Sequence, residues 1–211
     1  MYWSHLIARI PQLAQQPLPG QQAQFRMAHA GRYPSPAPPP PDAREAGVLM
    51  LLYPHQEEVY TVFIERAGGP AGDVHRGQIS FPGGKREKED ADMLASAVRE
   101  AEEEIGVPRS GVRVLRDLTP LYIPVSNFLV HPFVGMTDQR PDFLPQPEEV
   151  AQILEVPLRT VLDPAIRQVT DLQIHSGFTL RDVPYFDLSG HVVWGATAMI
   201  LSEFQSWWTG D

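Results

Sequence analysis

The clearest periodic pattern along the chain lies between residues 94 and 105. Apolar residues recur there at intervals of three and four positions, which predicts one apolar stripe of an α-helix: Leu94, Ala97, Val98, Ala101 and Ile105. Glu100, Glu103 and Glu104 follow the same spacing and share the opposite face of this helix. Gly106 and Pro108 indicate where the helix ends.

Strand patterns surround this helix. Runs typical of β-strands occupy residues 45–53, 59–65, 112–123, 128–136, 166–175 and 178–187, with a shorter strand in 153–158 and a helical turn in 159–163. The first run is apolar nearly throughout, as expected of a central strand that is covered on both faces. A second long helix is predicted within residues 192–208, where apolar side chains return at helical spacing. These elements predict an α+β fold with a mixed β-sheet between helices.

The first 42 residues follow a different pattern. A short amphipathic helix is predicted over residues 4–16, packed onto the rest of the protein. Residues 17–42 are rich in proline, which favours an extended polyproline II arm or linker. We therefore divide the chain into an N-terminal helix and arm, residues 1–42, and a single domain, residues 43–211.

Composition excludes several classes of protein. The net charge of −9 argues against nucleic-acid binding, which needs a basic surface. The chain has no cysteine, so neither disulfides nor thiol chemistry are available. It begins without the apolar core of a signal peptide and contains no apolar run of membrane-spanning length. We expect a cytoplasmic protein with no membrane or nucleic-acid partner; the sequence leaves its oligomeric state open.

The glutamates of the central helix are placed badly for stability. Like charges three or four residues apart cost roughly 0.2–0.5 kcal/mol per pair. They also lie in the last helical turns, where the helix dipole favours cations. One interpretation is a solvated acidic face. Oxygen ligands for a hard cation such as Mg²⁺ explain better why acids gather here behind a glycine-rich turn.

These residues carry a specific resemblance. Residues 99–107, REAEEEIGV, resemble the second half of the Nudix box, G-x(5)-E-x(7)-R-E-U-x-E-E-x-G-U with U aliphatic. The first half departs from the pattern, because the segment between Gly84 and Arg99 is one residue longer than in the box. Ala91 stands where the box has its first glutamate, so Glu89, Asp90 or Asp92 takes that place.

The residues before the box resemble the coenzyme A pyrophosphatase branch of the Nudix hydrolases. Residues 62–67 (VFIERA) and 75–85 (HRGQISFPGGK) follow its signature, although Asp73 stands where the signature has an arginine. The resemblance implies an αβα sandwich and hydrolysis of a diphosphate with Mg²⁺ or Mn²⁺. For coenzyme A, the products would be adenosine 3′,5′-bisphosphate and 4′-phosphopantetheine, or acyl-phosphopantetheine for an acyl derivative.

The resemblance also implies roles for individual residues. The metal would be held by Glu100, Glu103 and Glu104, with the backbone carbonyl of Gly84 or Gly83 completing the shell. Glu103 or Glu104 is the first choice of catalytic base and Glu148 or Glu149 the second, while Arg99 would orient the glutamates. The substrate would contact the signature loop and nearby cations: Arg66, His75, Arg76, Gly83 and Lys85. Among these, Arg76 is the candidate for the 3′-phosphate of coenzyme A, because guanidinium binds phosphate through two parallel hydrogen bonds.

Three alternatives remain from the sequence. One is a Nudix enzyme for another diphosphate, such as ADP-ribose, NADH or a dinucleotide. Another is a catalytically inactive Nudix fold that serves as a binding module, although an intact set of acids argues against it. The third is a structural protein that carries a plain acidic helix.

Overall fold

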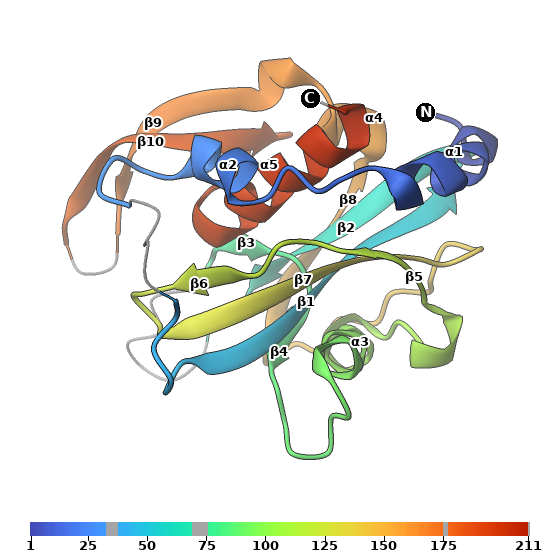
Figure 1. Ribbon diagram of the computed structural model, residues 1–211, viewed down its shortest axis with the longest axis horizontal. Helices are drawn as coiled ribbons and strands as arrows, with labels where there is room; N and C mark the ends of the chain where they lie inside the picture. The colour runs from blue at the N-terminus through green and yellow to red at the C-terminus, as the bar shows by residue number, and fades with distance from the viewer. Residues whose placement is uncertain (33–37, 69–75, 175–176, 211) are drawn as a thin grey trace.

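A mixed eight-stranded sheet separates two layers of helix in the computed structural model, which describes residues 1–32, 38–68, 76–174 and 177–210 (Figure 1). Its strands are β1 (Arg44–His55), β2 (Glu58–Arg66), β3 (Ile79–Ser80), β4 (Gly83–Lys85), β5 (Arg113–Asp117), β6 (Leu121–Ile123), β7 (Phe128–Met136) and β8 (Val150–Pro157). Five of them follow the order β3-β2-β1-β7-β5, while β4 pairs with β1, β6 with β7 and β8 with β2. Strands β1 and β7 run parallel, and the other pairs are antiparallel.

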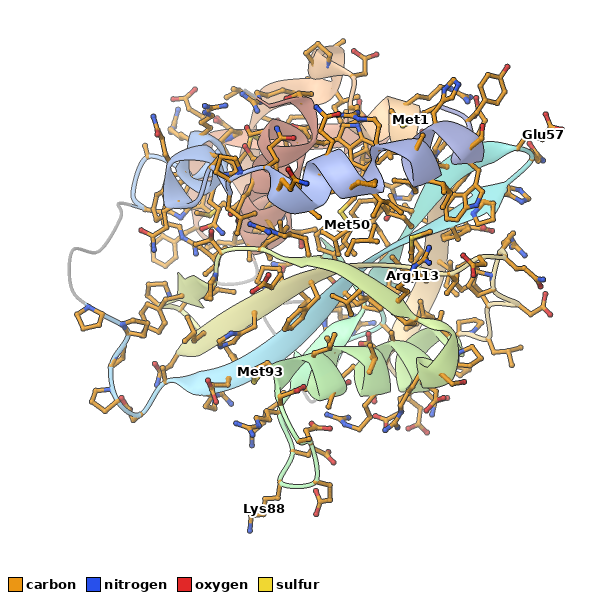
Figure 2. The ribbon with its side chains drawn as sticks, turned by 45° about the vertical axis from the view of Figure 1, so that its right-hand side comes forward. Met1, Met50, Glu57, Lys88, Met93 and Arg113 are labelled. Carbon is orange, nitrogen blue, oxygen red and sulfur yellow. The ribbon has the colours of Figure 1, made fainter. Side chains whose placement is uncertain are left out.

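The central strand β1 is buried on both faces. Met50 and Leu52 belong to the apolar core on one side of the sheet, while Leu49 and Leu51 belong to the core on the other. Figure 2 shows Met50 on the side that faces α1 (Trp3–Gln15). This double burial explains why the sequence of β1 is a nearly continuous apolar run.

Helix α3 (Met93–Ile105) covers one face of the sheet. The Asp92 side chain caps its first turn by accepting a hydrogen bond of 2.7 Å from the backbone N–H of Ala95. Gly106 ends the helix in the left-handed conformation, with φ of 74°. A Cβ atom on Gly47 of β1 would lie 2.4 Å from the carbonyl oxygen of Met93, so glycine at this position lets α3 approach the sheet closely.

The opposite face is covered by α5 (Gly195–Thr209) together with α1, α2 (Gln21–Gln24) and a 3₁₀ turn over Phe25–Met27 (Figure 1). A second, three-stranded sheet lies beside them, formed by β9 (Arg167–Gln173), β10 (Thr179–Leu188) and β11 (His191–Val193). The short helix α4 (Leu158–Val161) follows β8, and 3₁₀ turns occupy Arg109–Gly111 and Pro164–Ile166. The expected α+β class, with a mixed sheet between helices, is confirmed. Among the described residues, none of the helices combines the length and apolar character that crossing a membrane requires.

The structure corrects three expectations about individual elements. Residues 112–123 form two strands, β5 and β6, rather than one, with Pro120 in the gap between them. The C-terminal helix begins at Gly195, because residues 191–193 pair with β10 instead. The extended arm expected over residues 17–42 is wrong for residues 21–27, which are helical.

Residues 21–27 fold onto α5 because they carry both apolar and hydrogen-bonding anchors. Ala23 and Met27 are buried, with 0% and 1% of their surface exposed. The buried carboxylate of Glu203 accepts a hydrogen bond of 2.8 Å from the Gln24 side chain, and the Ser202 hydroxyl donates to the Ala23 carbonyl at 2.7 Å. The proline content of this region did not reveal these contacts.

Candidate functional site

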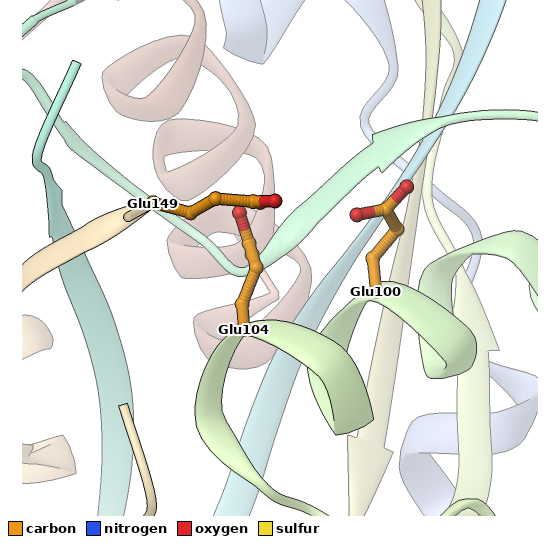
Figure 3. A group of neighbouring side chains, drawn as sticks. All are labelled: Glu100, Glu104 and Glu149. Atoms are coloured by element: carbon orange, nitrogen blue, oxygen red, sulfur yellow. The ribbon is translucent and has the colours of Figure 1, made fainter. Parts of the chain in front are cut away.

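Three carboxylates converge beside α3. Glu100 and Glu104 project from consecutive turns of the helix, and Glu149 comes from the residue that immediately precedes β8 (Figure 3). Each offers a carboxylate oxygen, and these oxygens all lie within 4.8 Å of one another. Such a set of oxygen donors suits a hard divalent cation.

The C-terminus of α3 positions the loop that carries Glu149. The backbone carbonyls of Glu104 and Ile105 accept hydrogen bonds from the N–H groups of Gln146 and Leu144, at 2.9 and 3.0 Å. The loop therefore satisfies carbonyls that a helix end leaves without partners. The carbonyl of Glu149 accepts a further bond of 2.9 Å from the N–H of Ala67, which fixes the start of β8 against β2.

Burial makes the carboxylates of α3 costly to ionise. The Glu104 side chain is 1% exposed and accepts a hydrogen bond of 2.8 Å from the backbone N–H of Gly83. The Arg66 guanidinium is 3.7 Å away, yet burial outweighs both contacts and raises the pKa of Glu104 to about 8. Burial also raises the pKa of Glu100. Buried carboxylates that lie this close together are typical of a cation-binding site, because a bound cation would compensate their negative charge.

The two glycines before the helix are required by their surroundings. A Cβ atom on Gly84 would lie 2.4 Å from the carboxyl carbon of Glu100, so Gly84 makes room for this side chain. Gly83 has φ of 153°, and its Cβ would lie 2.4 Å from the carbonyl oxygen of Gly47. Gly84 therefore brings strand β4 close to the carboxylate of Glu100, while Gly83 lets β4 pack closely against β1.

Arg99 is buried and contacts three acids, Asp90, Glu100 and Glu103. It donates two hydrogen bonds of 3.0 Å to the carboxylate of Asp90 and one of 3.0 Å to the backbone carbonyl of Lys85. It also lies 3.0 Å from Glu100 and donates a bond of 2.8 Å to Glu103. The bonds to Asp90 raise the pKa of Arg99 and lower that of Asp90. These contacts support the orienting role expected of Arg99.

Asp90, one of the three acids that the sequence offers for the place of the first box glutamate, pairs with Arg99. It is buried, with 6% of its surface exposed, whereas Glu89 is exposed and Asp92 caps α3. The segment from Arg86 to Asp92 forms a loop that hangs away from the sheet, with Lys88 near its tip (Figure 2).

The structure does not bring Glu103 or Glu148 into the group of carboxylates. The Glu103 side chain is 52% exposed and turns toward Arg99 and Arg109, whose guanidinium nitrogens lie 2.8 and 3.6 Å from it. Of the two loop acids considered as bases, Glu149 reaches the group, while the exposed Glu148 does not.

A cavity of about 800 Å³ opens beside the carboxylates. Glu100, Glu104 and Glu149 form one part of its wall, together with Arg66, Gly83, Gly84 and Lys85. Much of the remaining wall is apolar and comes from the sheet and from the start of α5: Val48, Phe81, Ile123, Phe128, Trp194 and Ile200. The Nε of Arg66 is buried and has no hydrogen-bond partner among the described residues.

The remaining expected substrate contacts are not all in this cavity. His75 lies outside the described residues. Arg76 lines a neighbouring, smaller cavity of about 300 Å³ together with Glu65 and His191. Two basic residues that no sequence motif singles out also line the large cavity, His29 and Arg32. Their one signal is charge, because residues 1–41 contain arginines but neither aspartate nor glutamate.

Comparisons with known proteins are consistent with this geometry. A family model described as the NUDIX domain matches residues 43–173. The chain is 39% identical over 127 residues to a protein from Yersinia enterocolitica named "Uncharacterized Nudix hydrolase NudL", covering 60% of this chain and 64% of that protein, which is less than two thirds of its length. A protein of the same name from Photorhabdus laumondii is 33% identical over 171 residues, covering 79% and 88% of the two chains. Among solved structures, the Nudix hydrolase RenU from M. smegmatis is similar with a TM-score of 0.46 and 18% identity, over 56% of this chain and 73% of that one.

Proposed function

The chain belongs to the Nudix hydrolase family, and from this premise we propose that it is a divalent-metal-dependent diphosphatase of coenzyme A. It would cleave coenzyme A, or an acyl derivative, into adenosine 3′,5′-bisphosphate and 4′-phosphopantetheine or its acyl form. The observation that carries the proposal is the group of three carboxylates at the wall of an 800 Å³ cavity. The choice of coenzyme A rests on the signature residues that surround this wall, Arg66 and Phe81–Gly84.

Glu100 and Glu104 would hold Mg²⁺ or Mn²⁺. When bound, the cation would offset the charge of the diphosphate oxygens and lower the pKa of a bound water. An ion pair with Arg99 holds the carboxylate of Glu100, and a hydrogen bond from the Gly83 N–H holds one oxygen of Glu104. Glu103 could join the ligands only by leaving Arg99 and Arg109, so it is not among the ligands we propose.

The remaining roles follow from exposure and charge. Glu149 is the exposed member of the group, so we assign it as the carboxylate that takes the proton of the attacking water. Arg66 lines the cavity wall, and its guanidinium would bind a diphosphate oxygen. No described side chain is arranged as an activated nucleophile, so the water itself would attack phosphorus.

A turnover assay with product identification tests the proposed function. With Mg²⁺ present, coenzyme A is expected to be hydrolysed with a higher kcat/KM than ADP-ribose, NADH or diadenosine tetraphosphate. In oxygen-18 water, one of the two phosphate products should carry the label, because the diphosphate reacts by displacement at phosphorus. If another diphosphate has a higher kcat/KM, that compound replaces coenzyme A as the proposed substrate. Absence of turnover on all of them would favour a binding module.

Replacing Gly84 by alanine should separate activity from stability. The added Cβ would displace the carboxylate of Glu100, which is the movable end of a flexible side chain. Turnover is expected to fall on the order of tenfold or more, because small misplacements of catalytic groups are costly, while the melting temperature stays close to that of the unmodified protein. Gly111→Ala is the matched control, since its Cβ would meet no atom within 4 Å. Equal turnover of both variants would show that Glu100 need not hold its position.

A further inference from the structure

The N-terminal segment contributes a basic group to the cavity. Arg32 and His29 line the same cavity as the three glutamates, yet they precede the match to the family model, which begins at residue 43. Arg32 is held against β6, an element that carries none of the glutamates, by a hydrogen bond of 3.0 Å from its Nη2 to the carbonyl of Tyr122. The cavity therefore has acids on one part of its wall and cationic or donor groups on another.

Within the described part of the chain, neither basic residue forms an ion pair with an acid. Among residues 1–32, 38–68, 76–174 and 177–210, no carboxylate lies within ion-pair distance of Arg32. Burial lowers the pKa of Arg32, and burial together with the charge of Arg32 lowers the pKa of His29. The Nδ1 of His29 accepts a bond of 3.2 Å from the Gly31 N–H, so a neutral ring carries its proton on Nε2 as a donor.

The charge distribution of the chain points the same way. The protein carries a net charge of −9, but its first 41 residues hold three arginines and no acid. A partly desolvated guanidinium without a carboxylate is stabilised by an anionic ligand, and its planar donors match phosphate. The diphosphate would lie at the glutamates, which leaves Arg32 to bind a second anionic group of the same ligand.

We propose that Arg32, assisted by His29, forms a subsite for a phosphomonoester of the substrate that is distinct from the diphosphate under attack. This inference rests on the proposed function, in which the 3′-phosphate of coenzyme A supplies that group. It moves the contact expected of Arg76 to the N-terminal segment, since Arg76 lines the smaller cavity and shares it with the acid Glu65. The N-terminal segment thereby determines which diphosphates are preferred.

The test compares coenzyme A with dephospho-coenzyme A, which lacks the 3′-phosphate. The unmodified protein should favour coenzyme A by about tenfold in kcat/KM, the expected worth of one charge-assisted contact. Arg32→Gln should bring the ratio close to one, mainly by raising KM for coenzyme A, and Arg32→Lys should keep part of the preference. Arg26→Gln is the matched control: it removes an exposed arginine of the same segment that bonds to Ser206 and does not line the cavity.

Several outcomes would overturn the subsite. These are equal kcat/KM for both substrates in the unmodified protein, an equal loss on both substrates in Arg32→Gln, or collapse of the ratio in Arg76→Gln instead. If neither substrate is hydrolysed, the proposed function fails, and calorimetric binding still tests the subsite. Adenosine 3′,5′-bisphosphate should then bind about tenfold more tightly than AMP to the unmodified protein. The Arg32→Gln variant should bind the two nucleotides with equal affinity. Equal binding of both nucleotides to the unmodified protein would reject the subsite.

Discussion

Replacing Glu104 by glutamine is expected to lower turnover by about a hundredfold or more, because the bound cation provides much of the charge stabilisation in the transition state. Glutamine keeps the shape of the side chain and can still accept the hydrogen bond from Gly83, so the loss isolates the negative charge. Glu102→Gln makes the same chemical change on an exposed part of α3 that bonds to Arg109, and it should leave turnover near normal. Near-normal turnover of Glu104→Gln at saturating Mg²⁺ would exclude Glu104 as a ligand.

The same variant should be more stable than the unmodified protein when metal is removed by a chelator. Burial raises the pKa of Glu104 from an ordinary 4.5 to about 8, so the folded protein binds more protons than the unfolded chain between these values. The contribution of Glu104 to stability therefore falls as pH rises through this window, at about 1.4 kcal/mol per unit of pKa shift. Glutamine does not ionise, so the variant lacks this loss of stability with rising pH.

Melting temperatures at pH 5 and pH 9 measure this effect. The difference between Glu104→Gln and the unmodified protein should be small at pH 5 and reach several degrees at pH 9, in favour of the variant. Added Mg²⁺ should stabilise the unmodified protein and have little effect on the variant, because a ligand that binds only the folded state raises its stability. A difference that does not change with pH would show that Glu104 is already ionised at pH 5.

The sequence predicts the helix that carries this site, but not which of its acidic side chains come together. The spacing of apolar residues places α3 and one acidic face, because a buried helix must present its apolar stripe to the sheet. That face is broad, however, and spacing alone cannot distinguish Glu103 from its neighbours. The structure turns Glu103 toward Arg99, one helical turn before it, and toward Arg109, which follows the helix. The helical pattern allows the pair with Arg99 but does not decide between that pair and a place among the other carboxylates.

Contributions from outside the helix were harder to predict. Glu148 and Glu149 are adjacent, and the register of β8 against β2, which pairs Val150 with Arg66, decides which of them reaches the group. Arg32 belongs to a segment whose proline content favours an extended chain. Its place in the cavity depends on the packing of residues 21–27 against α5 and on its bond to β6, both of which are tertiary contacts.

Removing Asp90 should produce the largest loss of stability among the acids that precede α3. Asp90 binds the buried guanidinium of Arg99 through both carboxylate oxygens, and the two side chains are 4% and 8% exposed. Asp90→Ala leaves Arg99 short of its main partner, and breaking a buried pair in this way costs roughly 3–5 kcal/mol. Asp92→Ala removes only a helix cap, at a cost of about 1 kcal/mol. Glu89→Ala changes an exposed residue, and its effect should stay within about 0.5 kcal/mol.

Urea unfolding of the three alanine variants measures the order of their stability losses. Turnover of the same variants shows whether the loss of Asp90 also disturbs the site. Without Asp90, the Nε and Nη2 groups of Arg99 lose their carboxylate partner and are free to turn toward Glu100, where they would compete with the cation. Asp90→Ala should therefore lose activity even at temperatures where it is fully folded, whereas Asp90→Asn, which still accepts a hydrogen bond from Arg99, should lose less. If Glu89→Ala or Asp92→Ala proved the most damaging of the three, the acid that pairs with Arg99 would have been assigned to the wrong position.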